Sequence, residues 1–382
     1  MSNIKNSANN SRRNFIKKAT LGAGLPLLLP TIMSGENRVI YDIRETLTPK
    51  RLALSMWDFS WLNCHHAGGS YEDYDKVTDE LLEICKRKHI YLILSTWNGG
   101  CVEIPGERIL QNSLEKCLDN WKKTLTILKD KNLLDIVAYV DLDQEFPYFS
   151  PRAKELSQIG KKADTSEGDL AAAMEAAGRN DPRGVKLLWN RAQLDYVRKL
   201  FDSSIGHLQW AFPELRFTYS LTSFWNEVRA AGIKNFDVIE IHPFISANND
   251  GQRFESRTHF GMMTKDRGEH DYGDYQDRVH KTFKAIRPML LGEIHNKLEF
   301  ARDWGKEISV PVVNTESWGP WWHMDHKDLD WGWLKDWCAE CNALAAKYGL
   351  WGTTPWNYGH PYWDNWKDVK WYRDVNDSFL KR

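Results

Sequence analysis

Two glutamates in this chain stand at the ends of apolar runs that read as buried strands. Glu145 follows the run at residues 136–142, and Glu316 closes the run at residues 310–316. A carboxylate is costly to bury unless it is paired or emerges at a functional rim. A pair of carboxylic acids around an acetal is the recurring arrangement for cleaving a glycosidic bond. Glu145 and Glu316 are therefore the candidate catalytic pair.

This pairing makes a geometric demand on the fold. In a retaining reaction, one carboxylate attacks the anomeric carbon while the other carboxyl group protonates the leaving oxygen, and the two lie about 5–5.5 Å apart. A separation of about 6.5–9.5 Å would instead indicate inversion. The pKa values of the two groups must also differ, low for the nucleophile and raised for the acid.

Several further polar residues stand at predicted strand ends and are expected near the candidate pair. Asp141 and Asp143 alternate with Glu145, so as anions on its face they would favour its protonated form. A structural role in holding loop amides explains these two aspartates equally well. His242 ends the strand that carries Glu240, and we expect it to hold the carboxylate of Glu316 or to contact substrate.

A second glutamate motif is better explained by structure. Trp225-Asn226-Glu227 follows the strand-like run 215–221 and opens a helical run, so helix capping and a solvated helix face account for it.

The chain contains 19 tryptophans, and several stand beside probable strand ends. An indole ring is a natural platform for the apolar face of a sugar. Core packing is the alternative for each, and it is the better explanation for Trp121 and Trp337. The candidate substrate-binding residues of this kind, with the aspartate that follows the first, are Trp57, Asp58, Trp97, Trp318 and Trp356.

Strand-like and helix-like runs alternate along the chain, which predicts an α/β fold with a parallel sheet. The candidate strands are Leu52–Met56, Ile90–Thr96, Ile136–Leu142, Leu215–Leu221, Phe236–His242, Val310–Glu316 and Leu350–Trp356. The candidate helices are Tyr74–Lys88, Leu114–Lys129, Leu188–Leu200, Tyr275–Ile286 and Leu334–Tyr348. Loops after the strands are long, and the insertion at about 146–184 reads as a part-helical lid or rim.

Four segments resemble bacterial cellulase-like proteins of the large (β/α)8 glycosidase clan. They are residues 55–61 (Ser-Met-Trp-Asp-Phe-Ser-Trp), 94–97 (Leu-Ser-Thr-Trp), 139–147 (Tyr-Val-Asp-Leu-Asp-Gln-Glu-Phe-Pro) and 314–319 (Asn-Thr-Glu-Ser-Trp-Gly). The resemblance implies a TIM-barrel-like fold with the acid/base Glu145 after strand four and the nucleophile Glu316 after strand seven.

The chain departs from this clan in two respects. Only seven strands are found, which implies that the second is shortened or missing, near Glu80 to Lys86. The clan carries an Asn before its acid/base glutamate to hold the sugar 2-hydroxyl, and here that position is Gln144, whose amide offers the same donor and acceptor on a longer arm.

The first residues have the pattern of a targeting signal. Residues 11–18, Ser-Arg-Arg-Asn-Phe-Ile-Lys-Lys, precede an uncharged stretch, which is the architecture of a twin-arginine export signal. We expect residues 1–36 to be this Tat signal with a disordered start, residues 37–382 to be one barrel domain, and the protein to pass through the Tat machinery to the periplasm or beyond. No membrane anchor other than the signal is expected.

Composition excludes other classes of partner. The formal net charge of −1 offers no basic surface for nucleic acid. Six cysteines are scattered, and the CxxC at Cys338 and Cys341 lies in a helical run without a second pair, so we read them as ordinary helix cysteines. Neither a cofactor nor a metal is expected.

The leading hypothesis is an exported retaining glycoside hydrolase that cleaves a β-linked oligo- or polysaccharide. The second is a carbohydrate-binding protein without catalysis on the same scaffold, suggested by Gln144 and the strand count. The third is a metal-dependent sugar isomerase or epimerase, because Asp141, Asp143, Glu145, His242 and Glu316 could together offer oxygen and imidazole ligands.

Overall fold

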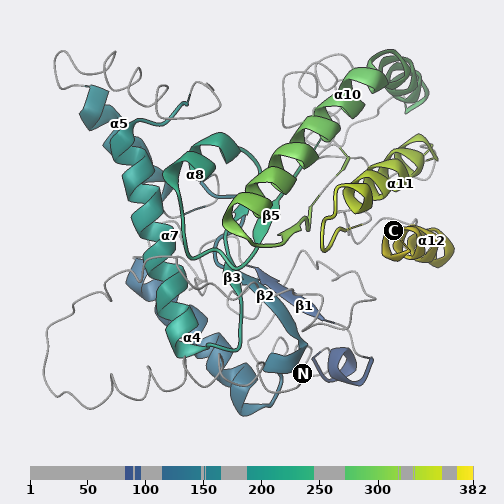
Figure 1. Cartoon of the computed structure of the whole chain (residues 1–382). Coiled ribbons are helices and arrows are strands. Elements are labelled where there is room, and N and C mark those ends of the chain that lie inside the picture. Colours follow the sequence, from purple (N-terminus) through teal and green to yellow (C-terminus); the bar gives the residue numbers. More distant parts are fainter. Residues whose placement is uncertain are drawn as a thin grey trace, which may run out of the picture. The chain divides into compact units, whose positions relative to one another are not determined.

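Figure 1 shows the computed structural model of the chain. It describes residues 82–88, 91–95, 114–147, 150, 152–164, 187–244, 272–316, 318–319, 330, 332–354 and 368–381. All of them belong to the compact unit Val39–Arg382. Several predictions lie outside the described residues: the export signal, the strand at Leu52–Met56, and the site residues Trp57, Asp58, Trp97 and Trp356.

The strands pair in parallel and in chain order. β1 (Leu92–Ser95), β2 (Val137–Asp141) and β3 (Phe217–Thr218) form one sheet, and β4 (Ser220–Leu221), β5 (Ile239–Ile241) and β6 (Val312–Val313) form another. Only Tyr219 separates β3 from β4, so both sheets share the extended run 217–221. A parallel bridge from Val313 to Gly352 adds one further segment. Six of the seven predicted strand regions therefore lie side by side in sequence order.

Helices alternate with these strands, which confirms the α/β class (Figure 1). In the described part of the chain they are the segment 82–88, α4 (Leu114–Asp130), η3 (Leu134–Ile136), α5 (Ala153–Asp164), α7 (Arg191–Ala211), α8 (Trp225–Ala231), α10 (Tyr272–Ile308), α11 (Gly332–Lys347) and α12 (Val369–Leu380). Helix α5 lies in the insertion that we expected to be part-helical. None of the described helices is long and apolar enough to cross a membrane.

Two helices extend well beyond their predicted bounds. α7 begins after Asn190, whose side chain accepts from the Gln193 amide while the Gln193 side chain accepts from the Asn190 amide, a reciprocal capping box. α10 continues through Pro288 to Ile308. A buried stripe at helical spacing holds it against its neighbours: Tyr275, Val279, Phe283, Ile286, Leu290, Ile294, Leu298, Ala301 and Trp304.

The sheet is covered by apolar residues on one face and becomes polar toward the strand ends on the other. A small apolar cluster, the floor, contains Ile93, Tyr139, Val238 and Val313. Two residues further along the same strands, and so on the same face, stand Ser95, Asp141, Glu240 and Thr315. The sequence thus builds a polar layer above an apolar floor, at the carboxyl ends of the strands.

The place expected for the second strand is helical. Residues 82–88 form a helical segment, with Leu82 and Cys85 buried in the main core. A strand remnant near Glu80 to Lys86 is therefore excluded over these seven residues.

Candidate active site

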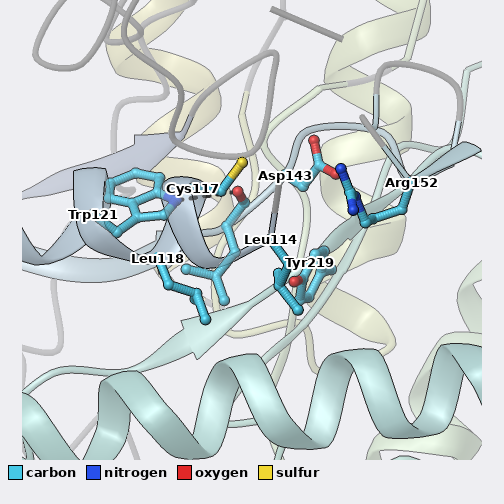
Figure 2. A pocket seen from close by; sticks show the side chains of 8 residues that line it. Leu114, Cys117, Leu118, Trp121, Asp143, Arg152 and Tyr219 are labelled. Carbon is cyan, nitrogen blue, oxygen red and sulfur yellow. Dashed lines mark hydrogen bonds between the residues drawn. The ribbon is translucent and has the colours of Figure 1, made fainter. Parts of the chain in front are cut away.

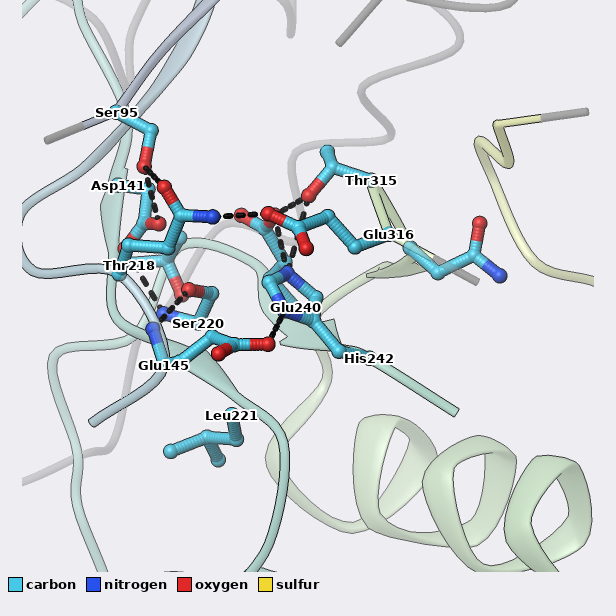
Figure 3. A network of polar contacts seen from close by, with 12 residues as sticks. Ser95, Asp141, Glu145, Thr218, Ser220, Leu221, Glu240, His242, Thr315 and Glu316 are labelled. Carbon is cyan, nitrogen blue, oxygen red and sulfur yellow. Dashed lines mark hydrogen bonds and ion pairs between the residues drawn. The ribbon is translucent and has the colours of Figure 1, made fainter. Parts of the chain in front are cut away.

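Three strand ends bring the candidate catalytic residues together (Figure 3). Gln144 and Glu145 follow β2, His242 follows β5, and Glu316 follows β6; all four side chains are buried. One carboxylate oxygen of Glu145, one ring nitrogen of His242 and one carboxylate oxygen of Glu316 lie within 4.8 Å of one another. The two glutamates singled out from the sequence are therefore neighbours.

Glu145 is held in an unusual backbone conformation. Its φ is 54°, in the left-handed region that a residue with a side chain rarely occupies. Its amide donates to Ser220 Oγ at 2.9 Å, and Thr222 Oγ1 donates to Glu145 Oε1 at 2.6 Å. These contacts fix the direction of the carboxyl group, and backbone strain of this kind gathers at functional sites.

His242 lies at the centre of the network. Nδ1 is 3.0 Å from Glu145 Oε1, and Nε2 is 3.2 Å from Thr315 Oγ1 and 3.5 Å from Glu240 Oε1. Burial disfavours the imidazolium, but Glu316, Glu145 and Glu240 outweigh it and raise the pKa of His242 well above its usual value. The ring contacts Glu145, Thr315 and Glu240, and the charge of Glu316 is the first among the effects that raise its pKa. The expectation that His242 holds the Glu316 carboxylate or contacts substrate stays a prediction.

Gln144 contacts the other glutamate. Its Nε2 donates to Glu316 Oε1, and its Oε1 lies 3.4 Å from the hydroxyl of Ser95. The Gln144 side chain is longer than the asparagine found at this position in the clan, and its amide reaches the carboxylate of Glu316. The residue expected to hold a sugar hydroxyl thus stabilises the charged form of Glu316 in this structure.

Asp141 takes a structural position. Its Oδ1 accepts from the Ser220 amide at 2.9 Å and its Oδ2 from the Ser95 hydroxyl at 2.7 Å. Burial, and then the charge of Glu240, raise the pKa of Asp141 to about 7. Of the two interpretations left open by the sequence, the contacts favour the one in which this side chain holds backbone amides.

Asp143 lies beside a small cavity. It lines this cavity together with Trp121, Arg152 and Tyr219 (Figure 2). Its amide lies 3.4 Å from Asp141 Oδ1. Asp143 therefore belongs to the support of the β2 end, outside the hydrogen-bond network of Figure 3.

Two interpretations of aromatic and acidic residues are wrong. Trp318 is fully buried and donates from its indole to the Thr354 carbonyl at 3.2 Å, so it packs in the core and offers no open platform for sugar. Glu227 lies in α8 but is buried rather than solvated. Its carboxylate accepts a hydrogen bond from the Leu188 amide at 2.9 Å.

Four hydroxyl residues of the network were missed from sequence: Ser95, Ser220, Thr222 and Thr315. Each stands at or just after the end of a short strand, so alternation along the strand could have placed them on the polar face. Hydroxyl residues are common at strand ends, which is why type alone did not single them out.

The three converging groups could offer donor atoms to a cation as well as to a sugar. A histidine must be neutral to bind a metal. The raised pKa of His242 favours the imidazolium, which donates protons and does not ligate. A cation at this site would therefore compete with a proton for the His242 ring.

The fold and the site define an α/β protein with a buried pair of glutamates at the ends of parallel strands. The family model described as sugar-binding cellulase-like matches residues 80–380, and the chain belongs to this family. This confirms the resemblance read from the sequence.

A solved structure supports the fold. The crystal structure of a protein from Parabacteroides distasonis, named as a candidate glycoside hydrolase, superposes with a TM-score of 0.57 at 20% sequence identity, covering 86% of this chain and 93% of that chain. None of the curated proteins is significantly similar to the sequence.

Proposed function

We propose that this protein is a retaining glycoside hydrolase that cleaves a β-linked glycan, with Glu316 as nucleophile and Glu145 as acid/base. The observation that carries the proposal is the approach of their carboxylate oxygens to within 4.8 Å. This short separation favours retention, which needs about 5–5.5 Å, over inversion, which needs room for a water between the carboxyl groups.

The reaction has two steps. In the first, Glu316 attacks the anomeric carbon, the bond to the leaving oxygen breaks, and Glu145 gives its proton to that oxygen. This leaves a glycosyl ester on Glu316. In the second, Glu145 takes a proton from water, the hydroxyl attacks the same carbon, and Glu316 is released as a carboxylate.

The neighbours of each glutamate support these roles. The Gln144 amide donates to Glu316 and so stabilises the carboxylate that must attack. His242 Nδ1 faces Glu145 Oε1 at 3.0 Å, a distance at which the pair can share one proton. The raised pKa of His242 favours this proton on the ring, and its transfer to Glu145 leaves His242 neutral and Glu145 ready to act as an acid.

Two further expectations belong to this proposal. The parallel segments from β1 to Gly352 follow chain order, which supports a TIM-barrel-like fold whose remaining wall would include Leu52–Met56. The twin-arginine pattern at residues 11–18 supports export through the Tat machinery to the periplasm or the extracellular space.

The proposal is tested by replacing each glutamate. We expect Glu316→Ala to abolish hydrolysis of all β-glycosides. Glu145→Ala should still release 2,4-dinitrophenol from 2,4-dinitrophenyl β-glycosides in the first step, whose leaving group needs no proton, hydrolyse the resulting ester slowly, and lose turnover of alkyl glycosides. Azide should then yield a β-glycosyl azide with Glu145→Ala only. Equal loss on both substrate types in both variants would overturn the assignment of roles.

The second candidate is a sugar-binding protein without hydrolysis. The family description as sugar-binding favours it, as does the contact between Gln144 and Glu316, which occupies the nucleophile. Glu316→Gln separates the two functions. A binder keeps its affinity for oligosaccharide by calorimetry and has no hydrolysis to lose, whereas the hydrolase loses turnover while still binding.

A further inference from the structure

Glu240 is a buried carboxylate that the proposed reaction does not use. It lies in β5, two residues before His242 on the same face, and is 1% exposed. Its Oε1 accepts from the Thr315 hydroxyl and lies 3.5 Å from His242 Nε2. A buried charge placed under a functional histidine can control that histidine, because the hydrogen bond at one ring nitrogen determines the state of the other.

The direction of the Thr315 hydroxyl settles which nitrogen carries a proton. Because Thr315 donates its only proton to Glu240, its oxygen can only accept from His242 Nε2, 3.2 Å away. Nε2 must therefore be protonated. Nδ1, facing Glu145 Oε1 at 3.0 Å, is then the nitrogen that can gain or lose a proton.

We propose that Glu240 is a positioning residue, acting through Thr315 to keep a proton on Nε2 of His242, so that Nδ1 is the nitrogen that exchanges a proton with Glu145. The proposal rests on the proposed function for its kinetic consequence, but the state of the ring can be measured without any turnover. Glu240 itself need not touch substrate.

Other ionisable groups face this cluster and enter the design of the test. Tyr139 and Asp141 reach it from β2, Glu145 from the segment after β2, and Glu316 from the segment after β6. Burial, and then the charges of Glu240 and Asp141, raise the pKa of Tyr139 far above its usual value, so this phenol stays neutral. All measurements on variants should therefore be compared with wild type at the same pH.

The first experiment reads the ring directly. In the full chain labelled with ¹⁵N-histidine, the His242 signals are assigned by their loss in His242→Gln. ¹⁵N shifts distinguish the Nε2–H tautomer, the Nδ1–H tautomer and the imidazolium. We expect wild type to show a protonated Nε2 throughout. In Glu240→Gln the amide can donate to Thr315, whose hydroxyl then turns to Nε2, so the Nδ1–H tautomer should appear.

Matched variants distinguish a specific effect of Glu240 on the His242 ring from a general disturbance of the fold. Glu227→Gln replaces another buried glutamate, in α8, and should leave the His242 signals as in wild type. Thr315→Ser keeps the relaying hydroxyl and should match wild type, whereas Thr315→Val removes it and should add the Nδ1–H tautomer. An unchanged ring in Glu240→Gln, or in Thr315→Val where Glu240→Gln does not fold, overturns the proposal.

The second experiment asks whether the ring state matters for turnover. We expect Glu240→Gln to lower kcat on alkyl glycosides by about 10- to 100-fold, the range seen when carboxylates that orient a metal-bound histidine are removed. For 2,4-dinitrophenyl glycosides, kcat/KM, which reports the first step, should change little because their leaving group needs no proton. Equal losses on both substrates overturn the role in proton transfer. If wild type hydrolyses nothing, the proposed function fails and the ring measurement still decides the role of Glu240.

Discussion

At the scale of single residues, buried acidic side chains outnumber buried basic ones in the candidate site. One histidine, His242, lies among the carboxyl groups of Asp141, Glu145, Glu240 and Glu316, all of them buried. Buried like charges raise one another's affinity for protons. The raised pKa values of His242 and Asp141 are the two ways in which this site reduces its excess negative charge.

Asp141 provides a pH-dependent test of this view. Its pKa rises from 3.8 to about 7 in the folded protein, so between these values the folded chain holds a proton that the unfolded chain has released. Stability relative to Asp141→Asn should therefore fall as pH rises from about 4 to about 7 and then level off. At about 1.4 kcal/mol per pKa unit, the total change is up to about 4 kcal/mol.

Urea unfolding of both proteins at pH 4, 5, 6, 7 and 8 measures this difference. The asparagine can still accept from the Ser220 amide, so other titrating groups cancel in the comparison. A free-energy difference that stays constant with pH would show that Asp141 is ionised throughout and that Glu240 does not raise its pKa.

Sequence reasoning singled out the candidate pair because a glutamate after an apolar strand has few structural explanations. It failed for Trp318, because a tryptophan beside a strand end suits a sugar platform and a core position equally well. It did not anticipate the contact between His242 and Glu145. Glu145 has a left-handed backbone conformation, and the residue type gives no sign of this.

At the scale of elements, helix α10 connects the core to the strand that carries Glu316. It packs against both β5 and β6, and Gly305 lies where the helix approaches β6. A Cβ at Gly305 would lie 2.7 Å from Val312 Cγ2 and 2.8 Å from the Val310 carbonyl oxygen. The absence of a side chain at this position sets the distance between helix and strand.

Gly305→Ala should therefore push β6 outward and displace Glu316. We expect a loss of about 1–3 kcal/mol in unfolding free energy, typical of overpacking, together with a fall in kcat. Gly292 is the control in the same helix, because a Cβ there meets nothing within 4 Å. Gly292→Ala should stabilise the protein by about 0.5–1 kcal/mol through helix propensity.

Urea midpoints and kcat measured on both variants decide between packing and propensity. Stabilisation of similar size in the two variants would mean that the close approach at Gly305 relaxes without cost. The strand positions could be predicted because parallel strands are short apolar runs, but the length of α10 could not. The predicted helix ended at Ile286, just before Pro288, and the buried stripe on both sides of this proline explains why the helix continues.

At the scale of the whole molecule, the site draws on segments far apart in the sequence. The parallel strands place Glu145, His242 and Glu316 after β2, β5 and β6 at the same edge, with the run of β3 and β4 between β2 and β5, which is why their meeting could be predicted. A group that bound all three at once would tie these segments together. It would then stabilise the fold as a whole, by about 2.7 kcal/mol at one hundred times its dissociation constant.

This linkage gives a test of the metal-dependent alternative that needs no substrate. Because Glu316, Glu145 and Glu240 raise the pKa of His242, a divalent cation would have to displace a proton from its ring. We therefore expect the same Tm near pH 7 in EDTA and in millimolar Mg²⁺, Mn²⁺ or Zn²⁺, and unchanged turnover after chelation. His242→Gln controls for ions that bind elsewhere on the surface. A Tm that rises with metal concentration in wild type but not in His242→Gln would instead assign a metal centre to these residues, and a sugar isomerase or epimerase would then replace the hydrolase as the function that the site supports.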